Sequence, residues 1–176
     1  RALPSDPEGW EEVLPPADDR TIEGFRLYDG HLVVAERSGG LRRLRVRDLA
    51  TGEDHHVAFP DDAYSLSGGE NETFEAVEHR LGYSALRTPG TVYDYDMAER
   101  RLIARKVQEI PSGFERDAYH AERIWAEAPD GARIPIDVMR RADAPPDGET
   151  PVFLYAYGAY GACIDPYFST ARLSLA

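Results

Sequence analysis

The stretch HLVVAERSGGLRRLRVRDLATGEDHHVAFP, residues 31–60, gives the clearest indication of fold in this 176-residue chain. It holds three short runs of apolar or alternating residues, at 31–37, 41–49 and 55–60, separated by glycine-containing turns. Short runs joined by tight turns are typical of an antiparallel meander. The stretch therefore predicts three consecutive antiparallel strands.

A second copy of this pattern begins at His79, 48 residues after His31. In that register Asp48 aligns with Asp96. Identity between the copies is low, but a period of this length with three or four strands per unit is typical of β-propeller blades. One blade cannot bury both faces of its sheet, so it needs neighbours, and this chain has too few copies to close a ring. Residues 61–75, between the copies, are polar and are predicted to form a loop.

The repeated pattern of short strands does not continue after residue 109. Residues 109–122 are interpreted as a linker, and residues 122–141 as a β-hairpin that turns at Pro129-Asp130-Gly131. After a second loop at 142–151 comes the run VFLYAY, residues 152–157, which is uninterrupted rather than alternating. Such a run predicts a strand buried on both faces, as in the centre of an α/β sheet. Open α/β sheets bind their ligands at the edge where such strands end.

Charge and composition narrow the class of partner. The net charge is −12, and a negative field disfavours binding to nucleic acid and to anionic membranes. No apolar stretch approaches the roughly 20 residues that span a bilayer, and residues 1–16 lack the pattern of a secretory signal. The first residue is Arg rather than Met, which predicts that the chain begins inside a longer product. The lone Cys163 cannot form an internal disulfide and fits a reducing, cytoplasmic compartment.

Three tyrosines, Tyr155, Tyr157 and Tyr160, lie at the end of the apolar run and in the loop after it. In α/β hydrolases the loop after the third strand supplies one donor of the oxyanion hole. A phenol hydroxyl could serve there, because it donates one strong hydrogen bond from a ring of fixed position. Packing, with the hydroxyls at the surface, is the simpler alternative, and the local sequence leaves both open.

No nucleophile or base is identified in the chain. There is no G-x-S-x-G motif, and none of the five histidines has a recognisable His/Asp setting. His55 and His56 are adjacent, but successive strand residues point to opposite faces, so their imidazoles should diverge and no metal site is predicted. Cys163 lacks a neighbouring base or positive charge, which favours a small structural residue over a catalytic thiol. No phosphate-binding glycine loop is present, and no cofactor is expected.

Residues 151–175, PVFLYAYGAYGACIDPYFSTARLSL, closely resemble the start of the catalytic domain of the prolyl oligopeptidase family. The better match is its trypsin-like branch, oligopeptidase B, which carries a YGYGSYG…D.DFS.SRLSL pattern there. Residues 122–141 resemble the hairpin that precedes that pattern. Residues 22–53 and 83–97 resemble the last blades of the family's seven-bladed propeller. The resemblance covers nearly the whole chain.

The resemblance implies a propeller that caps an α/β-hydrolase domain, and a Ser, His and Asp that lie downstream of the matched stretch. Tyr157 matches the tyrosine whose hydroxyl completes the oxyanion hole, and Tyr160 the aromatic residue that lines the primary specificity pocket. Asp165 matches the first of two acidic residues for a basic side chain just before the cleaved residue. The second acidic position is Tyr167 here, which puts a strong preference for paired basic residues in doubt. Ala156 replaces the usual glycine.

The predicted fold is mainly β, with a partial β-propeller at residues 1–117. The opening strands of an α/β-hydrolase catalytic domain follow at residues 118–176, truncated before the nucleophile. The predicted intact enzyme is a serine-type oligopeptidase that hydrolyses short basic peptides after Arg or Lys, whereas this segment alone is predicted to be inactive. The alternative is a non-catalytic β-rich, propeller-like binding module. A third hypothesis is a remnant of the enzyme that associates with itself, and the sequence leaves the oligomeric state open.

Overall fold

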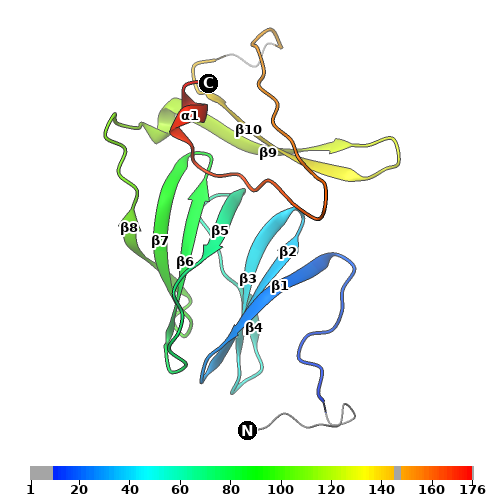
Figure 1. Cartoon of the computed structure of the whole chain (residues 1–176), viewed down its shortest axis with the longest axis vertical. Helices are drawn as coiled ribbons and strands as arrows, with labels where there is room; N and C mark the ends of the chain where they lie inside the picture. Colours follow the sequence, from blue (N-terminus) through cyan, green and yellow to red (C-terminus); the bar gives the residue numbers. More distant parts are fainter. Residues whose placement is uncertain (1–9, 145–147, 176) are drawn as a thin grey trace.

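Two four-stranded antiparallel sheets form the body of the molecule, as a computed structural model that describes residues 10–144 and 148–175 shows (Figure 1). Each sheet is a meander in which consecutive strands pair. The strands of the first sheet are β1 (Arg20–Leu27), β2 (His31–Ser38), β3 (Leu41–Asp48) and β4 (Asp54–His56). The strands of the second sheet are β5 (Tyr64–Gly68), β6 (Glu78–Ala85), β7 (Thr88–Asp96) and β8 (Arg101–Val107).

The turn after the third strand of each sheet confirms the predicted repeat. Asp48 accepts hydrogen bonds from the backbone N–H groups of Ala50 and Thr51, both at 2.8 Å. Asp96, 48 positions later in the sequence, accepts from the backbone N–H groups two and three residues further on, at 3.1 and 2.9 Å. An aspartate that bonds to its own following backbone fixes a tight turn. The same side chain therefore ends the third strand in both copies.

The loop predicted at residues 61–75 is only partly correct, because strand β5 (Tyr64–Gly68) lies inside it. Tyr64 and Leu66 are buried, and they point to the same face because side chains alternate along a strand. The strand is short and contains serine, so its two apolar positions were too few to reveal it. Each copy thus has four strands, which is the number in a propeller blade.

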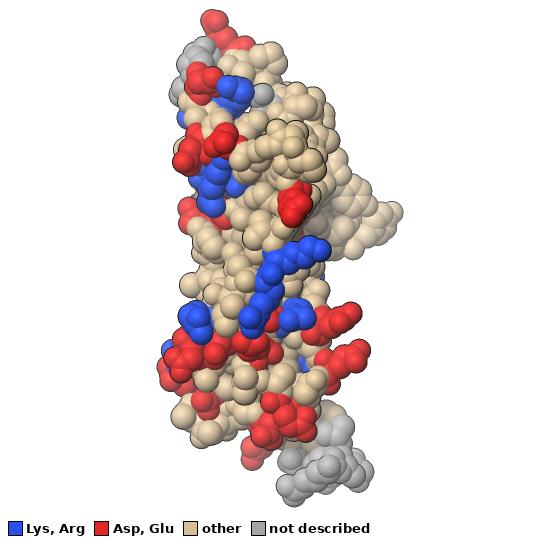
Figure 2. Space-filling view, turned by 90° about the vertical axis from the view of Figure 1, so that its left-hand side faces the viewer, with Lys and Arg blue, Asp and Glu red and all other residues tan. Residues whose placement is uncertain are grey.

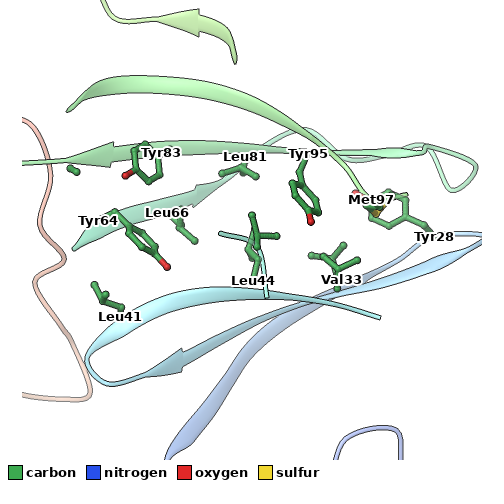
Figure 3. Packing of buried hydrophobic residues seen from close by; sticks show 13 residues of the cluster. Tyr28, Val33, Leu41, Leu44, Tyr64, Leu66, Leu81, Tyr83, Tyr95 and Met97 are labelled. Carbon is green, nitrogen blue, oxygen red and sulfur yellow. The ribbon is translucent and has the colours of Figure 1, made fainter. Parts of the chain in front are cut away.

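The hydrophobic core lies between the two sheets (Figure 3). Val33 and Leu44 of the first sheet face Leu81 and Tyr95 of the second sheet. Side chains from the inner faces of two sheets form such a core when the sheets pack face to face. The two sheets therefore stabilise each other, as the prediction that one blade needs a neighbour requires.

A two-stranded hairpin follows the second sheet and confirms the prediction at residues 122–141. It consists of β9 (Tyr119–Glu127) and β10 (Arg133–Arg141), and the short 3₁₀ helix η2 (Arg116–Ala118) precedes it. The turn between the strands contains Gly131 with a φ of 84°. Figure 1 shows the hairpin across one end of the two sheets.

Residues 152–157 do not form the buried central strand that the sequence predicted. They belong to no strand, and Val152 and Leu154 are 87% and 77% exposed. An apolar run becomes a buried strand only where other strands pair with it and cover both faces, and no other described residues do so here. The opening strands of an α/β-hydrolase domain are therefore not formed in this structure. The segment continues across the ends of both sheets to helix α1 (Thr170–Leu173).

Two of the predictions above fall partly outside the residues that the structure describes. Residues 1–9, which include Arg1 and most of the predicted non-signal N-terminus, lie outside the described residues, as do residues 145–147 of the predicted loop. Within the described part of the chain, no helix is long and apolar enough to cross a membrane.

Candidate functional site

Tyr157 and Tyr160 lie on the irregular segment between the hairpin and α1. Tyr157 is 55% exposed, and its hydroxyl has no hydrogen-bond partner among the described residues. Tyr160 is 99% exposed and has a φ of 56°, an uncommon backbone conformation for a residue with a side chain. A turn closes there, because the Ala162 N–H donates to the Ala159 carbonyl at 3.0 Å. The structure thus presents both rings to solvent.

Asp165, in contrast, is held by the first sheet. Both of its carboxylate oxygens accept hydrogen bonds from Arg37, near the end of β2, at 2.6 and 3.0 Å. The two side chains are each 18% exposed and come from positions 128 residues apart. A planar guanidinium and a carboxylate that make two parallel bonds form one of the stronger ion-pair geometries.

Arg37 has further partners, which make a four-residue group that we call the Arg37 cluster: Glu23, Arg37, Arg42 and Asp165. Its Nε donates to Glu23 at 2.7 Å, and Arg42 donates to the other oxygen of Glu23 at 2.5 Å. Burial alone would raise the pKa of Glu23, but the hydrogen bonds from the two arginines lower it below its usual value. The cluster therefore holds two cations and two anions.

Tyr167, at the second position where the resemblance expects an acid, interacts with a cation through its ring. The Arg172 guanidinium lies 4.4 Å from the centre of the Tyr167 ring and 5.4 Å from that of Tyr155. Arg172 also donates to the Tyr167 hydroxyl at 3.3 Å. Cation–π contacts at exposed positions stabilise by about 0.5–1 kcal/mol.

Phe168 fastens the same segment to the second sheet. It is 7% exposed and packs edge-on against Phe114, with 4.8 Å between ring centres. Its backbone N–H donates to the Ser84 hydroxyl at 2.9 Å. Through Asp165 and Phe168, one short stretch therefore contacts both sheets.

The hairpin is tied to the same end of the sheets. Arg123 of β9 makes two 2.7 Å bonds to Asp137 of β10 and one of 3.2 Å to the Gly39 carbonyl. A cavity of about 140 Å³ lies between the hairpin and the second sheet, and its lining includes Asp61 and Arg87. Asp61 accepts hydrogen bonds from Tyr83 and Thr88 at 2.7 Å and from Arg116 at 2.8 Å. The bond from Arg123 to the Gly39 carbonyl joins the hairpin to the first sheet, and Asp61 joins the second sheet to η2, just before the hairpin.

Other buried charges serve the sheets. Asp94, 3% exposed, is clamped by Arg80 and Arg105, and the hydrogen bonds from Arg80 first of all lower its pKa to about 2. Burial would raise the pKa of Glu36, but hydrogen bonds from Arg45 and His56 lower it. Figure 2 shows the side of the molecule that carries β8, where basic and acidic side chains lie next to one another rather than in a continuous basic surface.

The predicted divergence of His55 and His56 is confirmed. His55 bonds to Tyr95 of the second sheet at 2.7 Å, whereas His56 bonds to Glu36 at 2.5 Å on the opposite face. Burial lowers the pKa of His55. Among residues 10–144 and 148–175, no group of three His, Cys, Asp or Glu side chains could hold a metal ion. Cys163 is exposed.

Sequence reasoning missed Arg37. It is one of 20 basic residues, and nothing in its local pattern distinguishes it from other strand arginines. Its partner lies far along the chain, so only the assembled fold reveals the pair.

Comparison with known sequences gives a consistent picture. The family model described as "Prolyl oligopeptidase, N-terminal beta-propeller domain" matches residues 2–108. The chain is 39% identical to "Dipeptidyl aminopeptidase BI" of Pseudoxanthomonas mexicana, over 94% of this chain and 23% of that protein. It is 24% identical to "Protease 2" of Moraxella lacunata, over 90% of this chain and 23% of that protein. The chain thus spans about a quarter of the length of the curated relatives that it matches.

Two solved structures of oligopeptidase B share the fold of this chain. Oligopeptidase B from Trypanosoma brucei, with covalently bound antipain, matches 93% of this chain with a TM-score of 0.83 and 27% identity. Oligopeptidase B from Leishmania major matches 95% with a TM-score of 0.83 and 30% identity. The chain covers 24% and 25% of those two structures.

Proposed function

The chain belongs to the prolyl oligopeptidase family, and we propose that it is part of a serine peptidase of the oligopeptidase B type that hydrolyses short peptides after Arg or Lys. The observation that carries the proposal is the structural likeness to oligopeptidase B over 93% of the chain. That likeness is longer than the propeller match at residues 2–108, so it reaches the hairpin and the segment after it. Relatives with peptidase names support the same reaction class.

The proposed enzyme has two domains, and this chain contains a part of each. Residues 1–117 are the last part of the propeller, and residues 118–176 are the start of the catalytic domain, with nucleophile and base outside this chain. The exposed apolar residues at 152–154 support this division, because a strand that is buried in a sheet has to be apolar.

Tyr157 is the proposed oxyanion donor. Amide hydrolysis gathers negative charge on the carbonyl oxygen, and a prepositioned donor in a site that excludes water stabilises that charge by about 3–4 kcal/mol. Its hydroxyl has no partner among the described residues and is thus available to donate. Tyr160 is proposed to line the pocket for the side chain at the cleaved bond. Asp165 is proposed to receive a basic side chain one residue earlier.

A propeller above the catalytic site would restrict entry by size, so short peptides are the proposed substrates. The lone Cys163 supports a reducing, cytoplasmic location. Neither a metal nor a cofactor is part of the proposed chemistry, which side chains alone perform.

The test is hydrolysis of short peptide amides by the intact protein. We expect turnover of a substrate with Arg or Lys at the cleaved bond and at least roughly 100-fold lower kcat/KM for a neutral analogue, because a site built to bind a cation leaves its own polar groups unpaired when the side chain is neutral. The 176-residue chain, assayed alongside, should be inactive. Equal turnover of both substrates, or turnover by the isolated chain, would contradict the proposal.

A further inference from the structure

The carboxylate proposed to receive a basic side chain already has a guanidinium bound. Arg37 Nη1 and Nη2 lie 2.6 and 3.0 Å from the two oxygens of Asp165. A second guanidinium could not make the same paired bonds while Arg37 stays in place. The chain therefore carries its own occupant for this position.

The charge balance of the Arg37 cluster points the same way. Glu23 and Asp165 carry two negative charges, which Arg37 and Arg42 cancel. Hydrogen bonding to Asp165, first of all, raises the pKa of Arg37, so Arg37 stays cationic at every pH of interest. A peptide cation that approaches Asp165 thus meets a cluster with no net charge and stands close to a like charge.

Displacement of Arg37 remains feasible, because Arg37 would keep other partners. Its Nε bonds to Glu23 at 2.7 Å, and its Nη1 lies 3.4 Å from the Gly40 carbonyl. A partly buried arginine that loses every anion is strongly destabilising, whereas one that retains a carboxylate is not. Glu23 therefore allows Asp165 to change partners.

No second acid compensates at the neighbouring position. Tyr167 stands there, and its ring face is occupied by Arg172 at 4.4 Å. The resemblance assigns two described residues, Asp165 and Tyr167, to the basic side chain of the substrate. Of these two, Asp165 is the one carboxylate, and it is already paired with Arg37.

We propose that Arg37 competes with the substrate for Asp165, and that it thereby weakens the preference of the enzyme for a basic residue just before the cleaved one. This inference rests on the proposed peptidase function. Arg37 is a specificity-determining residue in this scheme. Its side chain bonds to Glu23, Gly40 and Asp165, and it makes no hydrogen bond to Tyr157, the proposed oxyanion donor.

The experiment uses the intact protein and two peptide amides that share Arg at the cleaved bond. One has Arg and the other has citrulline, its neutral analogue, just before it, and the ratio of their kcat/KM values measures the preference. In wild type the ratio should be small. Arg37→Met keeps the length of the side chain and removes the charge, and should raise the ratio roughly fivefold to tenfold.

Three companion variants make the result specific. Asp165→Asn should bring the ratio near unity, and Arg37→Met should then have no further effect. Arg101→Met, a change of the same charge at an exposed position of β8, should leave the ratio unchanged. Arg37→Gln replaces Arg37→Met if the latter fails to melt cooperatively.

An unchanged or lower ratio in Arg37→Met would overturn the inference, because Arg37 would then be irrelevant to Asp165 or would position it for the substrate. Failure of the proposed function looks different: no variant cleaves either peptide. In that case calorimetric titration with the dipeptide Arg-Arg still decides the matter. Binding that is tighter in Arg37→Met and lost in Asp165→Asn supports competition, and equal or absent binding in all variants refutes it.

Discussion

At the level of single residues, the buried core contains a pair of polar side chains that hydrogen-bond to each other. The Tyr28 hydroxyl, on a residue with no exposed surface, lies 2.8 Å from Nδ1 of His79, which is 9% exposed. Burial, with a smaller contribution from Arg26, lowers the pKa of His79 from 6.5 to about 4. The neutral imidazole is thus the form that fits the core.

This gives a prediction for the pH dependence of stability. Between pH 6.5 and 4 the unfolded chain binds a proton at His79 that the folded chain refuses, so the free energy of unfolding falls as the pH falls. From pH 7 to pH 5 the contribution of this residue should drop by about 2 kcal/mol. Urea unfolding of wild type and His79→Gln at both pH values measures it, because the difference between them should change by that amount.

His120→Gln is the matched control, since the side chain of His120 is 45% exposed. Its unfolding free energy should track wild type at both pH values. A pH dependence of His79→Gln as steep as that of wild type would mean that His79 titrates normally in the fold.

At the scale of elements, the β2–β3 turn is where the first sheet meets the hairpin. Gly39 and Gly40 both have positive φ angles, 58° and 76°, as a tight hairpin turn requires. A methyl group added at Gly40 would lie 2.8 Å from Cγ of Pro135 in β10, whereas one added at Gly39 meets nothing within 4 Å. Alanine at Gly39 therefore tests backbone strain alone, whereas alanine at Gly40 tests backbone strain together with a steric clash.

Gly39→Ala should cost about 1–2 kcal/mol, because a left-handed conformation strains any residue with a Cβ. Gly40→Ala should cost roughly 1–3 kcal/mol more, because Pro135 must also move. Urea denaturation of the two variants measures both amounts. Adding Pro135→Ala to Gly40→Ala should recover the difference between them, and equal costs without that change would show that the hairpin does not rest on this turn.

The elements also show which parts of a sequence are informative. The repeat was predictable because Asp48 and Asp96 make local turns, and local chemistry is visible in local sequence. Strand β5 was missed because only two of its residues point inward. Residues 152–157 were wrongly predicted to be a buried strand. Their apolar side chains show that the segment could be buried in a sheet, but not that neighbouring strands are present to cover it.

At the scale of the whole molecule, the two sheets should unfold together because they share one core. Leu81 of β6 is 1% exposed and packs in the cluster formed by both sheets. Leu81→Ala should destabilise the chain by about 2–5 kcal/mol. Amide hydrogen exchange should show protection falling in the first sheet as well as the second.

Leu49→Ala is the control for Leu81→Ala, because Leu49 is 44% exposed. It should change the free energy of unfolding by less than about 0.5 kcal/mol. Loss of protection confined to β5–β8 in Leu81→Ala would show instead that the two sheets are separate folding units.

The candidate site was only partly predictable for a related reason. Tyr157, Tyr160 and Asp165 came from a resemblance within one short segment. The pairing of Asp165 with Arg37 joins segments 128 positions apart, and no local pattern encodes it. Long-range electrostatic partners are a property of the assembled fold.

The proposed peptidase function assigns Tyr157 a hydrogen bond to an oxygen that becomes anionic during the reaction. The most direct measurement is the steady-state kinetics of Tyr157→Phe in the intact protein, with Tyr155→Phe as the control. If Tyr157 is the oxyanion donor, kcat should fall about 10²–10³-fold in Tyr157→Phe while KM changes little, and Tyr155→Phe should behave like wild type. An unchanged kcat in Tyr157→Phe would contradict this assignment.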